Sequence, residues 1–349
     1  ILRGGLEFAA EPERRLAVVS VEPFTTGEFN LRQGERELAH ALSFDAAPSG
    51  SLAQGEASAR LEGLSLKAGR AELLAGSTGV RQSLDTDTHP QLALDLRADL
   101  NGVAALPAVA ANLGSRSLPG GLSTDVRGKA SLLPSAVQVD ALAMDLRQTQ
   151  APKLLNASSR QVFSIQLNPS RKPALRQTAG TLARVSLRGL DLQWLSLFAG
   201  GRTLQGALAE AEFELRADQA GRYSLVSVAP VQIRGLGVRE GGKPLVEALD
   251  ITVAPTFAEL PAGWRAGLAG LSVRAGPATL LRGGIEVTGA ADGLGIEGEA
   301  AADLAACLQQ PALHALLPGR LPSAALAAQL DFKARQASAR TRFERFTAA

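Results

Sequence analysis

The chain has 349 residues, of which 36 are basic and 34 acidic, so the net charge is only +2. Hydrophobic residues make up 46% of the sequence and aromatic residues 4%. A nucleic-acid-binding protein would concentrate basic charge and interleave it with aromatic residues, and no such patch occurs. No apolar run reaches the roughly 18 residues of a membrane-spanning helix, so the sequence predicts no transmembrane segment.

Apolar and polar residues alternate along much of the chain, which is the pattern of strands with one apolar and one polar face. We predict strands at 61–69, 91–100, 136–147, 162–168, 184–193, 208–216, 231–238, 247–255, 270–276, 283–290, 293–300 and 326–334. Gly, Pro, Asp or Asn bound these segments. Strands with one dry and one wet face are typical of antiparallel sheets, whereas covered parallel strands would be apolar throughout.

Three segments have helical spacing of their apolar residues: 99–114, 191–201 and 303–319. Each begins at an aspartate that we expect to cap the helix, and these are Asp99, Asp191 and Asp303. We expect the helices to cap or plug the apolar face, with Trp194, Leu195 and Phe198 turned toward the interior.

The strand, Asp-Leu, helix and Leu-x-Gly sequence recurs, which predicts a repeated unit. The predicted fold is mainly β: an elongated, curled antiparallel sheet, open like a groove or a taco, built from repeats of about five strands plus a short helix. The expected units are 1–98, 99–190, 191–302 and a partial 303–349, and each of the last three opens with a helix. Because the chain has no initiator Met, we interpret 1–349 as a fragment of a longer protein.

The stretch RGLDLQWLSLFAGGRTLQGALAEAEFELRA, followed by VQIRGLGVREGGKPLVEALDITVAP, resembles the repeats of AsmA-like proteins, the bacterial envelope superfamily that includes TamB and YhdP. The resemblance covers most of residues 60–335, and its motifs are degenerate. It implies a long trough with an apolar concave face. It also implies a place in the periplasm of a diderm bacterium, with an anchor in the inner membrane through a segment that this chain lacks.

Local catalytic motifs are missing, so we predict no enzyme and no cofactor. The histidines His40, His89 and His314 lie in unrelated contexts, and we expect His314 to be packed on an apolar helical segment. We expect Cys307, the single cysteine, to be a small buried residue. The cluster DTDTHP at 85–90 has oxygen ligands at alternate positions but lacks the rest of a calcium loop, so we predict no metal site.

Two glycine-rich or acidic patterns have simpler explanations than chemistry. GGKPL at 241–245 has a Lys after two glycines, but we predict a hairpin turn there. Glu210, Glu212 and Glu214 form a row of carboxylates, which we interpret as the solvated face of a strand because nothing nearby would desolvate them.

The leading hypothesis is a non-enzymatic envelope protein whose apolar groove binds the acyl chains of phospholipid or another lipid, for transport between membranes or for outer-membrane assembly. Inner- and outer-membrane proteins are the further partners that we expect. The groove candidates are the apolar members of the best alternating strands: Ala209, Phe213, Leu215, Leu249, Ile251, Val253, Leu326, Leu330 and Phe332.

Two other functions remain open at the level of sequence. The first is a structural or interaction β-module with a closed core, which docks protein partners through its sheet edges. The second is a hydrolytic β-protein that acts on carbohydrate, ranked last because two Trp and one Tyr provide few platforms for sugars. Periodicity alone favours a closed core, and the family resemblance favours the groove.

Overall fold

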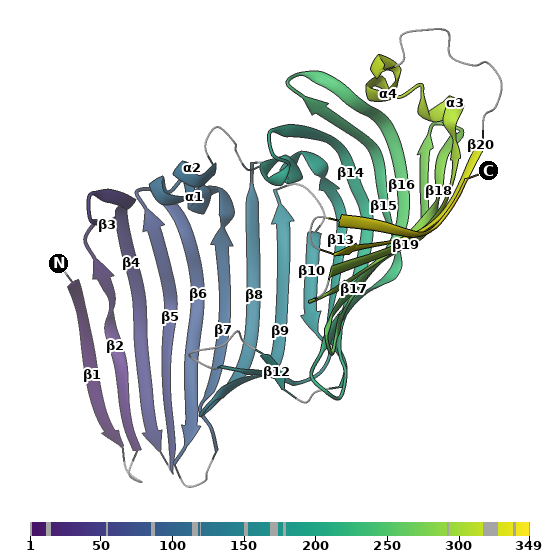
Figure 1. Cartoon of the computed structure of the whole chain (residues 1–349). Coiled ribbons are helices and arrows are strands. Elements are labelled where there is room, and N and C mark those ends of the chain that lie inside the picture. Colours follow the sequence, from purple (N-terminus) through teal and green to yellow (C-terminus); the bar gives the residue numbers. More distant parts are fainter. Residues whose placement is uncertain are drawn as a thin grey trace. The chain divides into compact units, whose positions relative to one another are not determined.

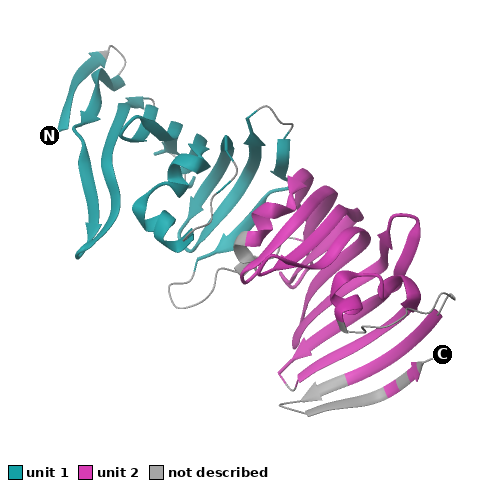
Figure 2. Ribbon diagram, turned by 90° about the horizontal axis from the view of Figure 1, so that it is seen from above, with its two compact units in different colours: residues 1–178 teal, residues 179–349 magenta. Residues whose placement is uncertain are grey.

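A computed structural model describes residues 2–11, 15–53, 55–84, 88–113, 118, 120–149, 153–167, 174–176, 179–291, 293–316, 327–337 and 340–348. The chain divides into two compact units, Ile1–Thr178 and Ala179–Ala349 (Figure 2). Each unit contains an antiparallel sheet and short helices, and each is considered by itself below.

Unit 1 is a sheet in which neighbours along the chain are mostly neighbours in space (Figure 1). Its strands are β1 (Leu2–Glu11), β2 (Arg15–Thr26), β3 (Phe29–Gln33), β4 (Arg36–Ala53), β5 (Glu56–Ala68), β6 (Ala71–Ser83), β7 (Gln91–Asp99), β8 (Leu122–Leu133), β9 (Ala136–Gln148), β10 (Lys153–Ser159), β11 (Phe163–Gln166) and β12 (Ala174–Arg176). Strands β2 and β3 pair with different parts of β4, and β10 and β11 with different parts of β9.

Unit 2 is a meander in which each strand pairs with the next one in sequence. Its strands are β13 (Gly180–Asp191), β14 (Arg202–Ala217), β15 (Tyr223–Glu240), β16 (Lys243–Leu260), β17 (Gly263–Ala275), β18 (Ala278–Ala290), β19 (Gly293–Asp303), β20 (Ala327–Ala337) and β21 (Arg340–Ala348). Every pairing recorded from β13 to β21 is antiparallel. The predicted class, a mainly β, open antiparallel sheet, is confirmed.

The three predicted helical segments are helical, and all three aspartates cap them. The segments are α1 (Leu100–Ala104) with α2 (Pro107–Leu113), the 3-10 helix η1 (Leu192–Phe198), and α3 (Leu304–Cys307) with α4 (Pro311–Leu316). The side chains of Asp99, Asp191 and Asp303 accept hydrogen bonds from backbone N–H groups of the first turn at 2.9–3.0 Å. In the first and third segments a proline begins a second short helix, where its missing N–H is tolerated.

The strands are longer than the sequence predicts, because several glycines continue a strand instead of ending it. Gly270 has φ +59° and lies at a register shift between Leu268 and Leu271, within β17. Gly235 has φ +62° and lies at a similar shift within β15. Such bulges add one residue and bend the strand. Figure 1 shows β14 to β16 curving along their length.

The GGKPL stretch forms the predicted hairpin. Gly241 and Gly242, with φ +55° and +80°, connect the paired residues Glu240 and Lys243. A two-residue turn with positive φ at both positions matches the twist of the flanking strands. The Lys therefore begins β16, and no phosphate cradle forms here.

The buried cores lie beneath the helices. In unit 1, Ala39, Leu42 and Leu73 pack with Val103 and Leu106 of the α1–α2 segment. In unit 2 the helix-covered cluster consists of Leu190, Leu192, Leu208, Ala211 and Val231.

The 3-10 helix η1 fits its expected role in part. Trp194 packs against the helix-covered cluster. The expectation for Leu195 is wrong, because its side chain is 41% exposed. The side chain of Phe198 lies outside the described residues.

Candidate functional site

An unbroken row of apolar residues crosses the sheet of unit 2. The row, called here the unit 2 row, takes one residue in register from each strand from β13 to β20: Ala183, Leu215, Leu225, Phe257, Ala266, Val287, Ile296 and Ala334. Most of its side chains are half-buried, and Leu225 is 36% exposed. With strands spaced about 4.8 Å apart, eight strands give a row of roughly 30 Å.

Unit 1 has a similar row on the face of its sheet that carries the α1–α2 segment. The unit 1 row consists of Phe8, Val18, Gly50, Ala59, Val80, Leu92, Ala130, Val139 and Phe163. At its β1 end the row borders a groove of about 450 Å³ lined by Phe8, Leu16, Val18 and Leu52 among others. Phe8 is 75% exposed there, so this end of the row is open.

In both units the helices cover one part of the apolar face and leave the row uncovered. Residue Ile251 pairs with Ile233, which packs against the helix-covered cluster, and Leu281 continues the same line on β18. Leu281 and Val287 are six residues apart on the regularly paired β18, so both point to one face. The helices thus divide one continuous apolar face into a covered half and an open half.

Three aromatic rings stack at the open half of unit 2. The centroids of Tyr223 and Phe257 are 5.8 Å apart with an interplanar angle of 27°, and those of Phe257 and Trp264 are 6.3 Å apart with an angle of 20°. Gly289 pairs with Trp264, and a Cβ atom at Gly289 would collide with the indole ring. Glycine at this position therefore lets the indole lie over the neighbouring strand.

The opposite face of each sheet carries cross-strand ion pairs. In unit 1, Arg127 and Asp95 are 3.2 Å apart and Arg81 and Glu56 are 2.8 Å apart. In unit 2, Arg265 and Glu286 are 3.4 Å apart. Exposed pairs of this kind stabilise a fold by about 0–1 kcal/mol each, so their main effect is to favour the observed register.

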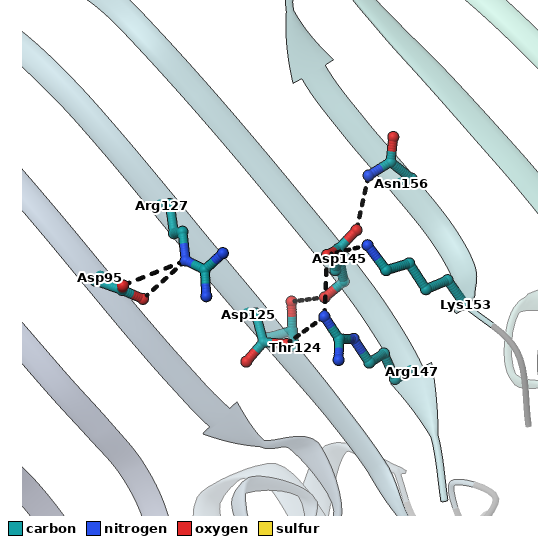
Figure 3. A network of polar contacts seen from close by, with 8 residues as sticks. All are labelled: Asp95, Thr124, Asp125, Arg127, Asp145, Arg147, Lys153 and Asn156. Carbon is teal, nitrogen blue, oxygen red and sulfur yellow. Dashed lines mark hydrogen bonds and ion pairs between the residues drawn. The ribbon is translucent and has the colours of Figure 1, made fainter. Parts of the chain in front are cut away.

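Asp145 is the centre of the densest polar network on the charged face (Figure 3). Its carboxylate accepts hydrogen bonds from Lys153 Nζ at 2.7 Å, Asn156 Nδ2 at 2.7 Å and Arg147 Nη2 at 3.2 Å. The Thr124 hydroxyl donates to the backbone carbonyl of Asp145. Burial by itself raises the pKa of this carboxyl, but the three hydrogen bonds outweigh burial and lower the pKa to about 2. The network joins β8, β9 and β10.

The carboxylate row of β14 lies on the charged face, as predicted. Arg184 of β13 donates to Glu212 at 2.6 Å, and Arg188 to Glu210 at 3.4 Å. The hydrogen bond from Arg216 lowers the pKa of Glu214. Carboxylates with lowered pKa values stay ionised at neutral pH and are poor proton donors.

The charged face of unit 1 also has a hollow of about 670 Å³ across β5 to β10. Its lining includes Arg60, Glu62, Asp95 and Arg127 beside several Gly, Ala and Ser residues. The two arginines pair with the two carboxylates, and Lys129 adds one further positive charge to the lining. The hollow is therefore a polar surface feature with a small excess of positive charge.

The predicted groove residues lie in both halves of the apolar face. Leu215 is in the unit 2 row. Phe332 pairs with Gly298, which pairs with Ile285 beside the unit 2 row, and Leu330 pairs with Ala300, two residues nearer to the line of Leu281. In contrast, Leu249 is 8% exposed. Leu326 lies outside the described residues.

The remaining groove predictions concern the covered half. Phe213 and Val253 pack against the helix-covered cluster, and Ile251 pairs with Ile233 of that cluster's border. Ala209 is half-buried and lies at a register shift between Leu208 and Glu210 against β15. Because of that shift, Leu208 and Ala211 both belong to the helix-covered cluster although they are three positions apart. The alternation of the stretch LAEAEFELR is therefore interrupted in the structure.

Sequence reasoning missed the aromatic set of Tyr223, Phe257 and Trp264. The three residues are on three different strands, and only the pairing register brings them together. The sequence signal that was available is their position: each lies near the end of a strand that adjoins a tight turn.

Cys307 and His314 differ in how well they match expectation. The Cys307 side chain is half-buried and its thiol donates to the Leu280 carbonyl oxygen at 3.4 Å. Burial, with a smaller contribution from Asp303, raises the pKa of the thiol, which keeps it protonated. The packed position expected for His314 is wrong, because this residue is exposed in the last turn of α4.

In the described part of the chain, no three side chains of His, Cys, Asp or Glu gather closely enough to hold a metal ion. Asp85 and Asp87 of the DTDTHP cluster lie outside that part. None of the described helices combines the length and apolar character that crossing a membrane requires.

Comparison with known proteins gives no further identification: no protein-family model, no curated protein and no solved structure matches this chain. The candidate site therefore has to be interpreted from its own geometry, and that geometry consists of an open apolar row in each unit backed by a charged face.

Proposed function

We propose that the chain is a non-enzymatic lipid-binding protein whose apolar face holds the acyl chains of phospholipid. The observation that carries this proposal is the unit 2 row, eight apolar residues in register without a polar interruption. Large exposed apolar surfaces are rare on soluble proteins and mark binding sites. Each methylene of a bound chain that leaves water contributes about 0.8 kcal/mol.

The resemblance of the sequence to AsmA-like proteins supports a role in moving lipid between membranes, or in outer-membrane assembly, within the bacterial periplasm. A row that runs across strands suits transport because it offers similar contacts from one strand to the next. An acyl chain lying on the unit 2 row would meet no deep pocket and no single strong contact. This location and this role are tested by fractionating the native host and by depleting the protein and measuring phospholipid distribution between the two membranes.

The direct test is lipid analysis of the purified protein, by native mass spectrometry and by extraction, followed by uptake of added phospholipid. We expect bound phospholipid in the unmodified protein and loss of it in Val287→Asp, because a carboxylate would then interrupt the unit 2 row. Thr288→Asp is the matched control, since Thr288 is the next residue of β18 and points to the charged face.

Circular dichroism and thermal melting establish that both variants fold. A folded, lipid-free wild-type protein that also takes up no added phospholipid would overturn the proposal. In that case the alternative, an interaction module that docks proteins through its sheet edges, would be examined by partner capture.

A further inference from the structure

The two tryptophans of the chain lie in different halves of the same apolar face. Trp194 belongs to η1 and packs against the helix-covered cluster. Trp264 belongs to β17 and stacks with Phe257 in the open half. The chain thus has one natural fluorescent reporter for each half.

The open half of unit 2 has a track that is continuous across strands. The unit 2 row, which includes Phe257, runs through it, and the rings of Tyr223 and Trp264 border the row on the side away from the helices. On the other border lie Leu268, which is 39% exposed, and its partner Ile285. An acyl chain that fills half of a bilayer core of about 30 Å extends about 15 Å, or about three strand spacings. The track is therefore long enough for one extended chain.

The chemistry of the track favours a ligand without polar groups. In the row itself all eight residues are apolar, and the two aromatic residues that border it, Tyr223 and Trp264, each carry one hydrogen-bonding group. A peptide laid here would bring backbone N–H and C=O groups that find few partners, which costs free energy for each unpaired group. A hydrocarbon chain has no such cost.

The covered half offers less room for a ligand. Leu190, Leu208 and Val231 are 9%, 9% and 7% exposed, and η1 lies over them. An acyl chain could enter the covered half only by displacing η1 and the packing contacts of Trp194. Separating side chains that are packed in this way lowers the stability of the fold.

We infer that one acyl chain of a glycerophospholipid lies across the strands of unit 2, along the unit 2 row and against Phe257 and Trp264, and stays out of the helix-covered cluster. This inference rests on the proposed function and adds the position and direction of the chain. The headgroup then lies beyond the row and is not selected by it.

The experiment uses phosphatidylcholine with dibrominated acyl chains, because bromine quenches tryptophan fluorescence only at short range. The variants Trp194→Phe and Trp264→Phe leave one reporter each, in the full chain. Each protein is loaded with the brominated lipid and, as a control, with unbrominated phosphatidylcholine, and the bound lipid is quantified by extraction. We expect the emission of Trp264 to fall to less than half and that of Trp194 to stay nearly unchanged.

The outcomes separate the inference from the proposed function. Bound lipid with Trp264 unquenched, or with Trp194 quenched to the same extent, would overturn the inference and leave the proposed function standing. Failure of the wild-type protein to bind phosphatidylcholine would overturn both. If Trp264→Phe fails to fold, the wild-type protein compared with Trp194→Phe still resolves the two contributions by difference.

Discussion

The covered and open halves of unit 2 use the same residue types on the same face and differ in what lies over them. Leu208 on β14 is 9% exposed beneath η1, whereas Leu225 on the neighbouring β15 is 36% exposed. Both are leucines in the antiparallel pairing of β14 with β15, and Leu208 borders a register shift. The difference shows that a helix of one or two turns suffices to turn an apolar sheet face into a core, and that the remaining face can serve another purpose.

The largest expected difference between the halves is in stability. Leu208→Ala should lower the free energy of unfolding by about 2–4 kcal/mol, because it removes packing and leaves a cavity. Leu225→Ala should cost less, about 1 kcal/mol, because more than a third of that residue is already exposed to solvent. Denaturant titration of both variants measures the difference. Equal losses would mean that the open half is packed as tightly as the covered half.

The charged face should affect stability without affecting either half of the apolar face. Asp145 has a folded-state pKa of about 2, below its usual value, so the unfolded chain binds the proton more tightly. Its stabilisation of about 1–2 kcal/mol is present above about pH 4 and is lost as the pH falls toward 2.

The substitution Asp145→Asn removes this stabilisation at neutral pH and flattens the dependence on pH between about 4 and 2. Thermal melts of both proteins across this range measure the effect, and lipid binding at neutral pH should be unchanged. A loss of lipid binding in the folded variant would contradict the separation of the two faces.

The helix caps offer a smaller test of how the cover is held. Asp191→Ala should destabilise unit 2 by about 1 kcal/mol, because the Gln193 N–H loses its acceptor at the start of η1. Asp191→Asn is the control, since its side-chain oxygen can still accept. Hydrogen exchange of the η1 amides should speed up in the alanine variant alone. Unchanged exchange would mean that packing of Trp194, and not the cap, holds η1 in place.

The smallest expected change in stability comes from Gly289→Ala, in the open half. The added methyl group displaces the half-buried Trp264 ring and leaves the helix-covered cluster untouched, so the free energy of unfolding should change by less than about 1 kcal/mol. The emission of Trp264, measured in a Trp194→Phe background, should nevertheless shift to longer wavelength as the ring becomes more exposed. An unchanged spectrum would place the ring away from Gly289.

Local patterns in the sequence predict the faces of the strands but not the extent of each strand. Alternation identifies β7 and β18 because no bulge interrupts Leu92 to Leu96 or Leu281 to Gly289. Gly241 and Gly270 both have positive φ, yet the first is in a turn and the second in a bulge. The two glycines differ in whether the strand continues to pair beyond them, and the sequence close to each glycine does not contain this information.

The candidate site depends even more on pairing. Leu215, predicted from its own strand, lies in the unit 2 row, but Leu225, Val287 and Ile296 join it only through the register of five further strands, β15 to β19. Gly-rich strands specify register weakly from local sequence, so the row could not be assembled from the sequence alone. That η1 covers part of the apolar face could be predicted only in general terms. The sequence shows the capping aspartate of η1 but not the residues that η1 contacts.

Because side chains alternate between the two faces, the position of an insertion or deletion determines whether the faces are preserved. Side chains repeat every two residues, so a single-residue insertion just before Gly284 in regular β18 would move Gly284 and Glu286 into the places of Ile285 and Val287. The same insertion at Gly270 would only enlarge an existing bulge. Insertions and deletions in related chains should therefore concentrate at the turns and at bulge glycines, and elsewhere in a strand should occur in pairs.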